Sequence, residues 1–168
     1  AVPWQKEPVR LVCAAGHPLA KQTEAELSDL DSMEMVGFDR SLELRRMIDA
    51  QLKRSGIRVD FRNEFDNADS IVRAIQANDG AGFLPEAAVR RETATGALRV
   101  VACRALKMTR PLGIIFRRAG RPSRAANEFG SLLLGRPLEP DREKHNSGNH
   151  SKSLSQGDTT KSSTSVVA

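Results

Sequence analysis

Two short polar stretches, Phe38-Asp39-Arg40-Ser41 and Asp66-Asn67-Ala68-Asp69, each follow a strand-like run and precede a helix-like run. In open α/β sheets, ligands bind at the carboxyl ends of strands, where the free N–H groups of helix N-termini attract anions. We therefore expect a carboxylate or another anion to bind here, paired with the guanidinium of Arg40. The predicted contacts are Phe38, Asp39, Arg40, Ser41, Asn67 and Asp69.

The same residue types also have a purely structural interpretation. Asp, Asn and Ser are common N-caps of helices, and their side chains satisfy the free N–H groups without any ligand. Asp39, Asp66 and Asp69 also place negative charge where an anion would bind. From the residues alone, an anion site and ordinary helix caps both remain open.

Gly80-Ala81-Gly82 resembles part of a phosphate-binding glycine loop. Such a loop follows a strand, opens a helix and contains a third glycine. Here the glycines follow a helix-like run and precede the apolar run at residues 81–84. We expect Gly80 to end the helix in the left-handed conformation and Gly82 to allow close backbone packing.

The remaining reactive side chains do not form a catalytic pattern. His17 precedes Pro18 and is predicted to belong to a turn, and neither a Ser-His-Asp nor a Cys-His spacing is present. Cys13 and Cys103 are isolated in apolar runs, which favours small buried side chains over a metal site. We predict no enzyme activity, no metal and no cofactor. Three carboxylates are best explained by solvation: Asp29, Asp31 and Glu34.

The spacing of apolar residues predicts the elements that position these groups. Strands are expected at 9–15, 33–38, 57–61, 81–84, 96–103 and 111–118. Helices are expected at 24–30 and 41–55, capped at Ser41 or Asp39, then from a cap at Asp66 or Asn67 to about 78, from Pro85 and from Pro122. The last helix should turn Ala126, Phe129, Leu132 and Leu133 inward. This alternation predicts a layered α/β fold with a largely parallel sheet.

Composition divides the 168 residues into two regions. Residues 7–135 contain the periodic apolar pattern, whereas 136–168 lack aromatic residues and are rich in Ser, Thr, Asn and Gly, which predicts a disordered tail. Charges cancel within residues 139–168, so the net charge of +5 lies in the folded part. Its densest basic run, 117–124, contains no aromatic side chain and is interpreted as a solvated face rather than a nucleic-acid site.

Four motifs, in this order and spacing, resemble the LysR-type transcriptional regulators. They are His17-Pro-Leu-Ala after the first strand, the turn Gly80-x-Gly-x-Leu-Pro-Glu86, the strand beginning Gly96-x-Leu, and the helix Arg118-x-x-Arg-Pro-Ser-x-Ala-Ala-x-x-Phe129. The resemblance covers about residues 7–134 and concerns the second half of the effector-binding domain.

The resemblance implies a lobe like that of type 2 periplasmic binding proteins, over about residues 16–108. Crossover strands at 9–15 and 110–117 and a returning helix at 122–134 would lead to a first lobe that is mostly outside this chain. Family members bind a small effector between the lobes, and residues 38–41 match their effector-contacting loop. DNA binding would come only from a winged helix-turn-helix outside this chain.

The resemblance therefore predicts the effector-sensing part of a cytoplasmic regulator that works as a homo-oligomer, with no membrane partner. A fragment of a type 2 solute-binding protein shares the same fold and is the first alternative. A truncated remnant without function is the second. An enzyme is the third, and it lacks candidate residues.

Overall fold

A computed structural model describes residues 1–115 and 122–138. The strands are β1 (Val2–Ala14), β2 (Glu34–Phe38), β3 (Asp60–Phe65), β4 (Ala81–Pro85), β5 (Leu98–Val101) and β6 (Met108–Ile114). The helices are the 3-10 helix η1 (Pro18–Lys21), α1 (Leu27–Leu30), α2 (Glu43–Arg54), α3 (Ala68–Ala77), α4 (Glu86–Ala94) and α5 (Arg124–Leu134).

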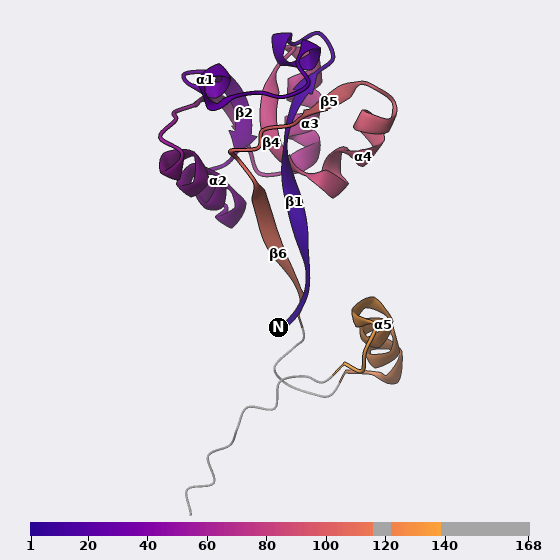
Figure 1. Cartoon of the computed structure of the whole chain (residues 1–168). Coiled ribbons are helices and arrows are strands. Elements are labelled where there is room, and N and C mark those ends of the chain that lie inside the picture. The colour runs from indigo at the N-terminus through magenta and orange to yellow at the C-terminus, as the bar shows by residue number, and fades with distance from the viewer. Residues whose placement is uncertain (116–121, 139–168) are drawn as a thin grey trace, which may run out of the picture.

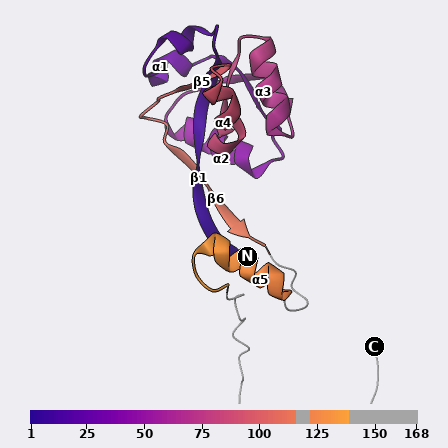
Figure 2. The same cartoon turned by 90° about the vertical axis from the view of Figure 1, so that its right-hand side faces the viewer.

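β1 is the strand on which the sheet is built. Its inner half pairs antiparallel with β4 on one edge and with β5 on the other, and its outer half pairs antiparallel with β6. β1 and β6 leave the compact part of the molecule together and run towards the N-terminus and α5 (Figures 1 and 2). They overlap the strands at 9–15 and 110–117 to which the family resemblance gives the role of crossover strands.

The expectation of a largely parallel sheet is wrong. Among the described strands, only β2 and β3 pair in parallel, whereas β1 runs antiparallel to each of its three partners. The alternation of strands and helices along the sequence does not determine the direction of each strand in the sheet. β1 runs in the direction opposite to that of β4 and β5. The parallel pair nevertheless carries both polar stretches singled out by their spacing.

The core lies between this sheet and the helices. The largest side chains that are almost fully buried come from strands and helices alike: Leu30, Met35, Ile48, Ile71, Ile75, Phe83, Leu84 and Leu98. β4 lies tightly against β2, since a Cβ added at Gly82 would be 2.5 Å from the carbonyl oxygen of Val36. This confirms the close backbone packing expected of Gly82.

α3 forms as its sequence predicts. The Asn67 side chain caps it by accepting a hydrogen bond from the Ser70 N–H at 2.9 Å, and Ile71, Val72 and Ile75 are buried. Its end differs from the expectation, because Asp79 rather than Gly80 has the left-handed conformation, with φ of 46°. Asp tolerates this conformation better than most residues, since its short polar side chain can hydrogen-bond locally.

Several element boundaries also differ from the expectation. β1 begins at Val2, β3 begins three residues and ends four residues later than predicted, and α2 begins after Leu42 with neither Ser41 nor Asp39 as its cap. Pro85 ends β4 and directly precedes α4, while Ser123 caps α5 by accepting from the Ala126 N–H. Residues 116–121, which include part of the predicted last strand and of the basic run, are outside the described ranges.

The predicted inward face of α5 is mostly solvent-exposed. The exposed fractions of Phe129 and Leu132 are 61% and 78%. The buried contact of α5 is Gly130, against which Leu138 packs, and the Leu138 N–H donates to the Ser131 hydroxyl. The first three residues of the predicted tail, 136–138, are thus described, and the rest of it, 139–168, lies outside the described residues.

Candidate functional site

The two polar stretches predicted to bind an anion lie side by side. β2 and β3 end in register, with Phe38 opposite Phe65, and the Asp39 N–H donates to the Phe65 carbonyl at 2.8 Å. The turn from β2 into α2 and the turn from β3 into α3 therefore lie together at the carboxyl end of the separate two-stranded β2–β3 sheet, which we call the edge. This edge carries all six predicted contact residues, since Phe38 to Ser41 belong to the first turn and Asn67 and Asp69 to the second.

The first turn is closed by Asp39. Its carboxylate accepts the Ser41 N–H at 2.8 Å, and its carbonyl accepts the Leu42 N–H. Hydrogen bonds from Ser41, with smaller contributions from Arg45 and Arg40, lower the pKa of Asp39, whereas its slight desolvation opposes them. Phe38, just before it, is buried.

The two helices that begin at this edge differ in their caps. Leu42 occupies the N-cap of α2 and makes no side-chain hydrogen bond to the N–H groups of the first turn. In α3, the side-chain Oδ1 of Asn67 accepts the Ser70 N–H, and the side-chain Nδ2 of Asn67 donates to Asp66 at 2.7 Å. Asn67 is thus engaged as an ordinary cap, and Asp69 is exposed in the first turn of the same helix.

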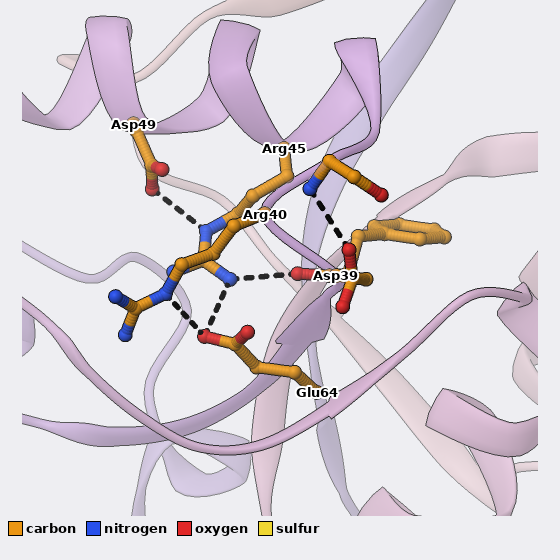
Figure 3. Close-up of polar contacts among 7 residues, drawn as sticks. Asp39, Arg40, Arg45, Asp49 and Glu64 are labelled. Atoms are coloured by element: carbon orange, nitrogen blue, oxygen red, sulfur yellow. Dashed lines mark hydrogen bonds and ion pairs between the residues drawn. The ribbon is translucent and has the colours of Figure 1, made fainter.

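Arg40 extends from this edge into solvent, and its side chain is 79% exposed. Its Nε donates to Oε1 of Glu64 at 3.1 Å, so the guanidinium already contacts a carboxylate of the chain itself (Figure 3). The prediction that Arg40 pairs with a ligand must therefore account for Glu64 as a competing partner.

Arg45 lies behind Arg40 and did not stand out in the sequence. Its side chain is only 5% exposed, and its Nη1 donates to the Phe38 carbonyl at 2.6 Å and to Oε1 of Glu64 at 3.0 Å (Figure 3). Its Nε donates to Asp49 at 2.8 Å, and its guanidinium carbon lies 3.8 Å from the centre of the Phe61 ring. Arg45 thereby joins α2 to the ends of both β2 and β3.

Glu64 is the shared acceptor of the two arginines. Burial by itself would raise the pKa of Glu64, but the hydrogen bonds and charges of Arg45 and Arg40 outweigh it and lower the pKa below its ordinary value. The carboxylate is therefore ionised at neutral pH. One sequence pattern could have indicated this cluster. Arg45 lies on the same helical face as the apolar Ile48 and Leu52, and Asp49 follows one turn later as a partner for its charge.

The other reactive side chains have structural partners. The Nδ1 of His17 accepts the Leu19 N–H at 3.1 Å and caps η1, which confirms the predicted turn. Burial raises the pKa of the Cys13 thiol, which disfavours the nucleophilic thiolate. Each of the three neighbouring carboxylates, Asp29, Asp31 and Glu34, also has a hydrogen-bond partner. Asp29 accepts from the Glu26 N–H, Asp31 from the Arg58 N–H, and Glu34 from Arg62.

The described residues contain neither a metal-binding cluster nor a membrane-spanning helix. No group of three or more His, Cys, Asp or Glu side chains is placed to hold a metal ion there. In residues 1–115 and 122–138, no helix combines the length and the apolar character that a membrane crossing needs.

β1 and β6, with the lobe from which they extend, form an α/β domain. The chain belongs to the family described as the LysR substrate binding domain, whose model matches residues 1–137. The family expectation drawn from the four motifs is thus confirmed.

Curated relatives are transcriptional regulators. The chain is 27% identical over 143 residues to a "Probable RuBisCO transcriptional regulator" of Trichormus variabilis, covering 83% of this chain and 42% of the relative. A protein of the same description from Cyanophora paradoxa is 28% identical over 137 residues, covering 79% and 42%. The chain therefore spans less than half the length of these relatives.

Solved structures share the fold. The regulatory domain of CcmR from Synechocystis PCC6803, in complex with 2-PG, gives a TM-score of 0.69 at 18% identity, covering 79% of this chain and 64% of that one. The effector binding domain of QuiR, in complex with shikimate, gives 0.67 at 21% identity, covering 80% and 63%. These likenesses confirm the predicted fold class, a lobe like that of type 2 periplasmic binding proteins.

Proposed function

We propose that this chain is the effector-sensing part of a LysR-type transcriptional regulator, and that a small anionic metabolite binds at the edge where the β2–α2 and β3–α3 turns meet. The observation that carries the proposal is the junction itself. Parallel pairing of β2 and β3 brings the uncapped N-terminus of α2 and the exposed Arg40 to one place. The N–H groups and the guanidinium both favour an anion.

The relatives favour this function over the alternatives. The curated relatives are described as probable transcriptional regulators. Two of the solved domains are complexes, one with 2-PG and one with shikimate. In the intact regulator, we expect a winged helix-turn-helix to bind DNA, and the protein to act in the cytoplasm as a homo-oligomer. The same comparisons give no support to a transport protein or to an enzyme.

The position of the edge also supports an effector site. The β2 arrow points towards the end of the lobe from which β1 and β6 extend (Figure 1), and β3 ends beside it because the two strands are parallel. A second lobe would close over the ligand on this side. A ligand held by one wall makes fewer contacts and keeps more of its water. If the missing wall is worth even about 4 kcal/mol, affinity falls about a thousandfold, so this chain should bind anions at millimolar strength.

Chemical-shift titration of the ¹⁵N-labelled chain suits such weak binding. Phosphate, acetate, 2-PG and shikimate are added in turn, at constant pH and ionic strength. We expect at least one anion to shift the amide signals of residues 40–45 in a saturable way. Arg40→Ala should weaken this binding by about 1.5–3 kcal/mol, the range for a hydrogen bond to a charged group.

Arg104→Ala is the matched control for Arg40→Ala. The Arg104 side chain is 85% exposed and pairs with Glu24 at 3.2 Å, much as Arg40 pairs with Glu64. Its removal takes away the same charge outside α2 and outside both turns. Equal weakening by both variants would show that only the overall charge matters, and saturable shifts confined to another part of the chain would place the site elsewhere.

A further inference from the structure

The two arginines that share Glu64 differ sharply in how firmly they are held. Arg45 is buried and contacts the Phe38 carbonyl, Asp49 and the Phe61 ring as well as Glu64. Arg40 is mostly exposed, and Glu64 is the acceptor that it has among the described residues. Buried ion pairs are costly to break, whereas exposed ones contribute little. Arg40 can thus leave Glu64 easily, and Arg45 cannot.

Departure of Arg40 does not leave Glu64 without a counter-charge. The same oxygen, Oε1, still accepts from Nη1 of Arg45 at 3.0 Å. The carboxylate therefore keeps its position when Arg40 turns to another acceptor. It also keeps its negative charge beside the edge, where Asp39 adds a second one. An incoming ligand must out-compete Glu64 for the Arg40 guanidinium.

We infer that Glu64 is a specificity-determining residue of the proposed site, an internal competitor that occupies Arg40 until an anionic ligand takes the guanidinium from it, while Arg45 holds Glu64 in place. This inference rests on the proposed function. Carboxylates and phosphates can accept two parallel N–H bonds from a guanidinium, so they compete well with the single hydrogen bond to Glu64. Neutral molecules gain no such advantage, so only an anionic ligand displaces Glu64 from Arg40, and Glu64 limits the affinity with which it binds.

The variant that tests the inference is Glu64→Gln. Glutamine can still accept from Arg45 but has lost the charge that attracts Arg40 and repels an anion. We expect phosphate, measured by the same chemical-shift titration, to bind about twofold to fivefold more tightly, the range for loss of an exposed ion pair. Glu24→Gln is the matched control, because it removes the carboxylate that pairs with the exposed Arg104 at 3.2 Å, outside α2 and outside both turns.

A second measurement uses the unmodified chain and does not depend on how the variant folds. The Nε–Hε signals of Arg40 and Arg45 are followed while phosphate is added. We expect the Arg40 signal to move with the same saturation curve as the backbone amides of residues 40–45, and the Arg45 signal to stay in place.

The outcomes separate this inference from the proposed function. If phosphate binds at the edge but Glu64→Gln and Glu24→Gln change its affinity equally, or the Arg40 signal does not move, the competitor role of Glu64 is overturned while the site stands. If no anion gives saturable shifts in the unmodified chain or in Glu64→Gln, both proposals are wrong. Tighter binding in Glu64→Gln alone, with a moving Arg40 signal, supports both.

Discussion

Arg45 donates from a buried guanidinium to three acceptors, on the end of β2, on β3 and on its own helix. Five residues earlier, Arg40 has the same chemistry but remains mostly in solvent. The two guanidinium groups carry the same charge and differ in burial. The buried Arg45 fixes the turn, whereas the exposed Arg40 is free to exchange hydrogen-bond partners. Burial also determines how the side chain of His17 titrates.

His17 should make stability depend on pH. Burial lowers the pKa of His17 below its ordinary value of 6.5, and the nearby charge of Asp79 only partly opposes this. The folded state then binds fewer protons than the unfolded state. The resulting contribution to stability is complete above pH 6.5 and is lost as the pH falls through the lowered folded pKa. Protonation also removes the Nδ1 acceptor for the Leu19 N–H.

The variant His17→Asn tests whether His17 causes this pH dependence of stability. Asparagine caps helices well and does not titrate between pH 5 and pH 7. We expect the thermal midpoint of the unmodified chain to fall more than that of His17→Asn between pH 7 and pH 5. Scanning calorimetry at both pH values, at one ionic strength, would measure it. Equal falls in the two proteins would assign the pH dependence to other groups.

Local patterns in the sequence predicted the elements better than their pairing. The cap at Asn67 and the spacing of Ile71, Val72 and Ile75 depend only on neighbouring residues, so α3 was predicted almost to its ends. Strand direction and the length of β1 depend on distant partners such as β6, which no local pattern contains. For the same reason the two polar turns were predicted, but the bond from Arg40 to Glu64, 24 residues away, was not.

α5 presents an apolar face that the described residues leave uncovered. Phe129 and Leu132, one helical turn apart, are both exposed, while the Trp4 indole N–H donates to the Leu133 carbonyl at 2.9 Å and holds the helix by its C-terminal end. Burial of a side chain such as Phe or Leu contributes roughly 1.5–3 kcal/mol. The isolated chain should therefore self-associate through this face.

Phe129→Asp should shift the isolated chain towards the monomer, because it places a charge in the middle of the apolar face. Asn127→Asp is the control, since Asn127 is also exposed on α5 and two residues along a helix point to a different side. Sedimentation velocity over a range of concentrations would compare the two variants. If Phe129→Asp changes neither the oligomeric state nor the thermal midpoint, α5 is not the contact surface.

Across the whole molecule, a buried carboxylate ties β1 and β6 to α4, next to the part of β1 that pairs with β4 and β5. Glu7 of β1 is buried; its carboxylate accepts from Arg110 of β6 at 2.7 Å and from the Ala87 N–H in the first turn of α4 at 3.2 Å. Beyond this point the β1–β6 ladder continues to Val2 and Ile114, with an irregular register between Pro3 and Gln5. The lobe and α5 are therefore joined through a narrow two-stranded connection, seen in Figure 2.

The distribution of charge over the molecule gives the last prediction, which concerns DNA. The net charge is +5, but many basic side chains of the described residues pair with carboxylates: Arg10, Arg40, Arg45, Arg46, Arg62, Arg104, Arg110 and Arg124. Sequence-specific recognition needs a helix or strand in a groove with several side chains directed at base edges. Dispersed basic residues can contact phosphates only, and such binding falls steeply with salt.

We expect the purified chain to bind two unrelated duplexes of equal length with affinities within about twofold at 50 mM salt, and to lose most of this binding at 200 mM. Fluorescence anisotropy with both duplexes at both salt concentrations would measure it, and a preference for one duplex of more than about tenfold that persists at 200 mM salt would assign base recognition to this chain itself.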